Sequence, residues 1–83
     1  MDVTLVWQER VRGTRWDARW RSGRGRQAHV WVERDGGAWQ FHVRLFSETT
    51  MLFGHGGWDR DRETAQHLAE AMLVRQLDRL GGG

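Results

Sequence analysis

Apolar and polar residues alternate along much of the chain, the pattern typical of strands with one buried and one exposed face. The clearest stretch is 15–21, where Trp16, Ala18 and Trp20 alternate with charged residues. Similar alternation predicts strands over 3–11, 27–34 and 38–46, and a shorter, glycine-broken strand over 51–58. Turn residues separate these stretches, with Asp35-Gly36-Gly37 the strongest hairpin signal. We therefore expect consecutive strands to form an antiparallel meander.

The periodicity changes near the C-terminus. Asp59 or Asp61 suits a helix N-cap, and apolar residues then recur every three or four positions over 62–80, which predicts an amphipathic helix. The stripe consists of Ala65, Leu68, Ala69, Met72, Leu73, Leu77 and Leu80. The expected fold is α+β: a four- to five-stranded antiparallel β-meander with one C-terminal helix packed on one face. Residues 1–80 would form a single domain, and 81–83 a flexible glycine tail.

Composition excludes several kinds of chemistry. The 83 residues contain no cysteine, lysine or tyrosine, and both serines fall in predicted turns, so neither an enzyme nor a cofactor is expected. His29, His42 and His55 align in one strand register, but we interpret them as polar-face residues and expect no metal. All thirteen basic residues are arginine, and the net charge is only +2. Neither a signal segment nor a membrane span is visible, which favours a cytoplasmic protein.

One helix covers only one face of a sheet, so the other face is expected to meet water. The alternation places Trp31, Phe46, Met51 and Phe53 there, if Phe46 pairs with Met51. Arginines and histidines rim this apolar patch: Arg19, Arg44, His29 and His42. Such a composition is typical of an interaction surface. The structural alternative is that the sheet curls and these aromatics fill a second small core, or that Trp31 stacks on Arg19.

Two other functions compete with protein binding. The first is a small nucleic-acid-binding domain, in which Trp31 stacks on bases and Arg21, Arg24 and Arg26 of an arginine-glycine loop touch phosphates. The second is a homodimer whose exposed sheet faces pack together. The leading prediction is a non-enzymatic protein-interaction domain with a protein partner.

The format of the chain resembles a known group of proteins. It is short and cysteine-free, it has a predicted sheet plus one helix, and residues 58–73 read WDRDRETAQHLAEAML. In size and layout it is similar to small accessory proteins of phages and mobile elements, including many anti-CRISPR proteins. The resemblance implies a stoichiometric inhibitor that occludes a nucleic-acid-binding or partner-binding surface of a host defence complex. It implies no particular site residues.

Overall fold

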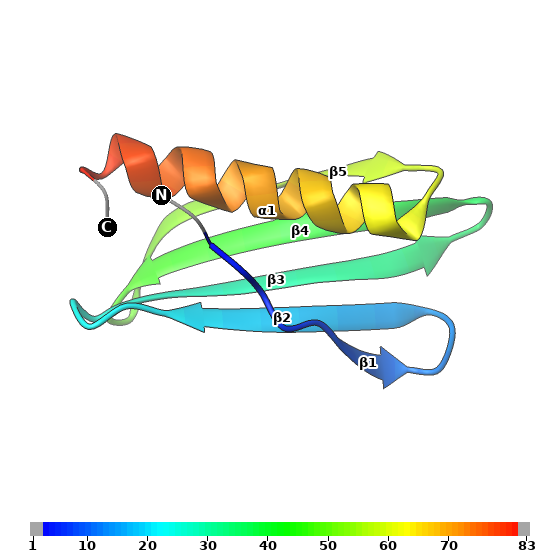
Figure 1. The fold of residues 1–83 in the computed structure, drawn as a ribbon, viewed down its shortest axis with the longest axis horizontal. Coiled ribbons are helices and arrows are strands. Elements are labelled where there is room, and N and C mark those ends of the chain that lie inside the picture. The colour runs from blue at the N-terminus through cyan, green and yellow to red at the C-terminus, as the bar shows by residue number, and fades with distance from the viewer. Residues whose placement is uncertain (1–2, 82–83) are drawn as a thin grey trace.

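A computed structural model describes residues 3–81, which form one five-stranded antiparallel sheet and one helix. The elements follow in chain order: β1 (Gln8–Val11), β2 (Arg15–Arg21), β3 (Arg26–Asp35), β4 (Ala38–Ser47), β5 (Thr50–Asp59) and α1 (Arg62–Arg79). Each strand lies beside the next in sequence, and α1 runs along one face of the sheet, where it contacts β3, β4 and β5 (Figure 1). The predicted α+β fold is confirmed. The one helix within residues 3–81 is too polar to cross a membrane.

The central strands follow the predicted alternation. Ala18 on β2 pairs with Val30 on β3, which in turn pairs with Val43 on β4, and all three side chains are buried. The pairing register keeps the apolar sides of the three strands on one face of the sheet. Gly36-Gly37 joins β3 to β4, and Gly36 takes the positive φ of 63° that such a turn requires.

The helix packs on the sheet through one row of residues spaced four apart: Ala65, Ala69, Leu73 and Leu77. Their sheet partners include Val30, Val32, Val43 and Leu45. Asp61 caps the helix by accepting a hydrogen bond from the Thr64 backbone N–H at 2.9 Å. Leu68 and Leu80 each lie three residues beyond a member of the row, so these two predicted core residues sit at its side and are exposed. Gly81 follows the helix with a φ of 85°; the remainder of the predicted glycine tail, 82–83, lies outside the described residues.

The predicted first strand is only partly formed. Gln8 pairs with Asp17 and Glu9 with Trp16, but the pairing shifts to Val11 with Arg15 near the turn. Residues 3–7 are not part of the sheet, so the first part of the strand predicted over 3–11 was wrong.

This N-terminal segment instead crosses over β2 and β3 on the helix side (Figure 1). Leu5 is buried in the core, and the Trp7 indole Nε1 donates a hydrogen bond to Glu70 Oε1 at 2.7 Å. Because the helix reaches only β3 to β5, the apolar side of β2 needs a second cover. The N-terminal segment provides that cover.

Strand β5 contains a bulge that changes which side chains face the helix. Phe46 pairs with Met51 as predicted, but Leu45 pairs with Phe53, so Leu52 is an extra residue. The prediction that Phe53 lies on the face away from the helix was wrong. One extra residue reverses the side of every later position, and Phe53 packs against the core with Leu45.

The bulge also reverses His55, which lies opposite Val43 on the helix side. Gly57 lies opposite Phe41, where an added Cβ would come within 2.7 Å of the Phe41 ring atom Cζ. Gly57 therefore leaves the room that the Phe41 ring occupies in the core.

Candidate functional site

The candidate site is the face of the sheet opposite α1, called here the open face. On β2 it carries Arg15, Asp17, Arg19 and Arg21, and on β3 Gln27, His29, Trp31 and Glu33. On β4 it carries Gln40, His42, Arg44 and Phe46, and on β5 Met51, Gly54, Gly56 and Trp58. The sequence predicted the positions on β2 to β4 through their alternation. It missed Trp58, because the bulge at Leu52 brings that residue to this face.

Trp31 lies at the centre of the open face, between Asp17 on β2 and His42 on β4. The His42 ring stacks on it with 4.7 Å between centroids and 17° between planes, and the His29 ring lies 4.9 Å away. The guanidinium carbons of Arg44 and Arg15 lie 5.0 and 5.7 Å from the Trp31 ring centroid. We call these five residues the Trp31 cluster.

The cluster shields Trp31 from water, leaving it only 8% exposed. The expectation that Trp31 is an exposed contact residue was therefore wrong, because long basic side chains from three strands fold over its ring. The structural alternative predicted a cation–π contact between Arg19 and Trp31; the ring does make such contacts, but with Arg15 and Arg44. Trp31 thus acts as a small second core that orders the groups above it.

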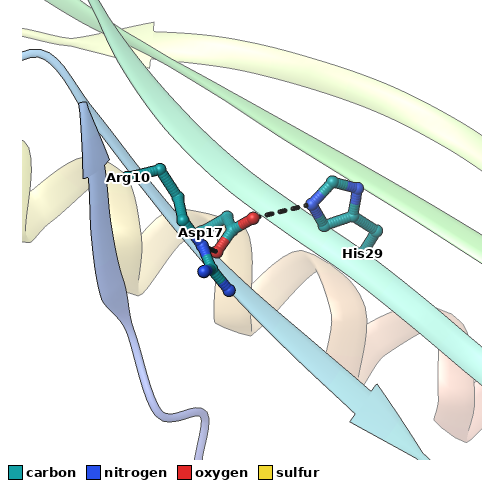
Figure 2. A network of polar contacts seen from close by, with 3 residues as sticks. All are labelled: Arg10, Asp17 and His29. Atoms are coloured by element: carbon teal, nitrogen blue, oxygen red, sulfur yellow. Dashed lines mark hydrogen bonds and ion pairs between the residues drawn. The ribbon is translucent and has the colours of Figure 1, made fainter.

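A buried carboxylate anchors one side of the cluster. Arg10 Nε donates a hydrogen bond to Asp17 Oδ1 at 2.7 Å, and His29 Nε2 lies 3.2 Å from Asp17 Oδ2 (Figure 2). Burial alone would raise the pKa of Asp17, but the hydrogen bonds and charges of Arg10 and His29 outweigh it and hold this pKa below the usual value. Asp17 is consequently ionised at neutral pH and fixes the His29 ring beside Trp31.

A second acid lies on the other side of Trp31. His42 Nε2 is 3.5 Å from Glu33 Oε1, within ion-pair distance. That nitrogen is shielded from solvent and has no hydrogen-bond partner. The contact is therefore an electrostatic attraction without a hydrogen bond, and it exists only when His42 is protonated. The Glu33 carboxylate offsets part of the positive charge around Trp31.

Apolar side chains gather along the β4–β5 side of the open face. Trp58 is 63% exposed and Met51 56% exposed, while Phe46 is half-buried. A hollow of about 610 Å³ opens beside Phe46 and Met51; its lining includes these two residues with His42, Arg44, Gly54 and Gly56, but not Trp58. Its glycines contribute no side chains, so the floor is low. The predicted contact residues Phe46 and Met51 thus border this hollow, together with Arg44 and His42.

The open face carries the net positive charge of the chain. Its arginines are Arg15, Arg19, Arg21 and Arg44, and Arg10 joins them through its hydrogen bond to Asp17; its acids are Asp17, Glu33 and Asp35. Five arginines against three acids give a net charge of +2, whereas the rest of the chain holds eight arginines and eight acids. Among residues 3–81, neither Arg19 nor Arg44 forms an ion pair. Both residues are exposed.

The structure brings together only part of the predicted arginine-glycine site. Arg21 and Arg26 line one hollow, which Glu48 also lines, whereas Arg24 lies in the exposed loop outside that lining. One guanidinium nitrogen of Arg26, Nη1, is shielded from solvent. His55 is likewise separated from His29 and His42, and no group of three metal-ligating side chains forms within the described part of the chain.

Comparisons of the chain with protein-family models, with curated proteins and with solved structures found no match.

Proposed function

We propose that the chain is a non-enzymatic protein-interaction domain that binds its partner through the open face. One observation carries this proposal: a whole sheet face lies uncovered, with Trp58 and Met51 exposed beside a cluster of ordered arginines. Tryptophan, methionine and arginine are enriched in protein interfaces, and tryptophan and arginine supply many of their hot spots. A flat face of this composition suits a folded or extended protein segment.

Two features favour a protein over a nucleic acid as the partner. The nucleic-acid hypothesis uses Trp31 as the ring that stacks on bases, and this ring is covered by its cluster. Strong phosphate binding requires many basic contacts, whereas only Arg21 and Arg26 of the predicted three line one hollow, and the acid Glu48 lines it with them. A face-to-face homodimer is also less favourable, because it would bring together two faces that each carry net positive charge.

The phage-type inhibitor is the sharper version of this proposal. In that case the domain binds a host defence complex stoichiometrically and occludes one of its surfaces. The net charge of the open face favours an acidic surface, since a basic nucleic-acid channel would repel it. Occlusion of a partner-binding surface is therefore the form of inhibition that fits this chain.

The test is affinity capture of tagged protein from lysate of the source cells, with and without nuclease, read by mass spectrometry. Trp58→Ala removes an exposed anchor on the open face, while Leu68→Ala removes an exposed apolar side chain on the helix and serves as the matched control. We expect a nuclease-resistant protein, captured stoichiometrically by the wild type and by Leu68→Ala but lost with Trp58→Ala. Recovery of nucleic acid alone, or a protein partner indifferent to Trp58→Ala, would refute the proposal.

Salt and self-association give independent checks. Capture through an apolar interface should weaken modestly with salt, whereas phosphate binding with six or more contacts falls by roughly three decades or more between 50 and 200 mM. Sedimentation at micromolar concentration should give a monomer; a dimer broken by Trp58→Ala would support the homodimer instead.

A further inference from the structure

We propose that the partner presents a short acidic segment whose carboxylates bind Arg19 and Arg44, with an adjacent apolar residue that enters the hollow beside Arg44. This inference rests on the proposed function, because it names the chemistry of the partner that occupies the open face. It follows from the juxtaposition of arginines without ion-pair partners and an apolar hollow within one surface.

The arginines lie in one row across three strands. His29 pairs with Arg19 on β2 and with Arg44 on β4, so the two arginines flank it. Adjacent strands are about 4.8 Å apart, which separates the two arginine backbones by about 10 Å. Two carboxylates placed two residues apart on an extended segment are separated by about 7 Å, within reach of both flexible side chains.

The Trp31 ring prepares one of these arginines for binding. The Arg44 guanidinium carbon lies 5.0 Å from the ring centroid, so part of the entropy cost of ordering this side chain is met before a ligand arrives. A guanidinium that lies over an aromatic ring still directs its N–H donors outward, in the planar geometry that suits a carboxylate. Arg19 makes no such contact and contributes as a flexible second donor.

The hollow specifies the neighbouring residue of the partner. Phe46 and Met51 line it with apolar surface, and an added Cβ on Gly54 would lie 3.1 Å from Met51 Sδ, so the Met51 side chain lies across the floor. Because methionine is flexible, this side chain can move aside for a leucine or phenylalanine. An acidic residue at Arg44 therefore places its apolar neighbour over Met51.

The charge pattern favours a short carboxylate segment over a continuous polyanion. Asp17 and Glu33 lie among the arginines of the same face and would repel a phosphate backbone running across it. A segment with a few carboxylates can contact Arg19 and Arg44 while avoiding both acids. The source of the oxyanion is accordingly a protein side chain.

The test is an NMR titration of the full chain with synthetic peptides that have blocked termini. The probe alternates glutamate with leucine and phenylalanine; a second peptide has glutamine for glutamate, and a third has serine for the apolar residues. Arginine Nε–Hε and tryptophan indole signals report the site. We expect the glutamate peptide to shift Arg19, Arg44 and Trp31 signals, and each of the other two peptides to bind on the order of tenfold more weakly.

Protein variants distinguish binding at this site from a general attraction between the peptide and the positive charge of the protein. Arg44→Gln should weaken binding of the glutamate peptide about tenfold, since it removes a charged donor with little change in bulk. Arg75→Gln removes the same charge from the exposed outer side of α1 and should leave affinity within about twofold. A single-stranded oligonucleotide serves as the polyanion probe.

Several results would overturn the inference. These are equal affinity for the glutamate and glutamine peptides, equal effects of Arg44→Gln and Arg75→Gln, or tighter binding of the oligonucleotide at the same arginines. The proposed function is judged separately by the capture experiment. If capture depends on Trp58 but is unchanged in Arg44→Gln, the acidic-segment inference is wrong and the protein-interaction proposal stands.

Discussion

Replacing Trp31 by alanine tests whether the centre of the open face is a true second core. Trp31 is 8% exposed, stacks on His42 at 4.7 Å and lies beneath Arg44 and Arg15. Truncating a buried tryptophan to alanine costs about 3–5 kcal/mol, and lost cation–π contacts account for about 0.5–1 kcal/mol each within that range. We expect Trp31→Ala to lower the free energy of unfolding by about 3–5 kcal/mol.

Urea denaturation followed by far-ultraviolet circular dichroism measures this change. With an m-value near 1 kcal/mol per molar urea for a chain of this size, the midpoint should fall by several molar. A domain with roughly 5 kcal/mol of stability could unfold outright, so Trp31→Phe, expected to lose about 1–2 kcal/mol, keeps the measurement quantitative. Trp58→Ala removes the same side-chain type from the same face and is the control.

The control distinguishes the effect of removing a buried side chain from the effect of removing any tryptophan from this face. Trp58 is 63% exposed, so its removal should change the free energy of unfolding by less than about 1 kcal/mol. If Trp31→Ala and Trp58→Ala shift the urea midpoint equally little, the basic side chains do not enclose Trp31 in solution. Trp31 would then be available to a ligand and able to stack on a base.

Three further predictions concern charge, packing and register. The folded-state pKa of Asp17 lies below its unfolded value near 3.8. Its ion pairs therefore add stability above pH 3.8, and this stability is lost as the pH falls through the folded-state pKa. At pH 7, Asp17→Asn should lower the free energy of unfolding in urea by about 1–2 kcal/mol, and the difference from wild type should shrink as the pH falls below 3.8. Gly56→Ala should destabilise by about 1–3 kcal/mol, because its Cβ would lie 2.4 Å from the Phe41 backbone oxygen, whereas Gly54→Ala meets only flexible Met51 and should be near neutral in thermal melts. Deleting Leu52 removes only the extra residue of the bulge, so the two-dimensional NMR spectrum should keep the wild-type pattern outside β5; a collapsed spectrum would contradict the register.

Much of the fold could be predicted because period-two alternation and turn length are local properties. On β2 to β4 the alternation correctly divides residues between the two faces, and the turns at 36–37 and 48–49 keep the faces matched. The helix begins at Arg62 as predicted, since Asp61 caps it. These features depend on near neighbours in sequence, which the sequence displays directly.

The errors arose where distant segments decide the outcome. The bulge at Leu52 depends on how β5 pairs with β4. It places Phe53 on the helix side and Trp58 on the open face. The burial of Trp31 depends on arginines and histidines from neighbouring strands folding over it. The departure of the N-terminal segment depends on the apolar side of β2 that the helix leaves uncovered. None of these signals lies within a single stretch of sequence.

Under the proposed function, the open face combines a structural and a binding role, and its arginines divide between them. Arg15 and Arg44 cover Trp31, so their loss affects stability as well as any ligand contact, whereas Arg19 makes no contact with that ring. A small cysteine-free chain with one helix gains from a second core on its other face, because a single core stabilises so few residues only weakly. The guanidinium and imidazole groups that cover this core also place ordered hydrogen-bond donors at the surface. If the proposed function is right, the residues that stabilise the uncovered sheet are also those that bind the partner.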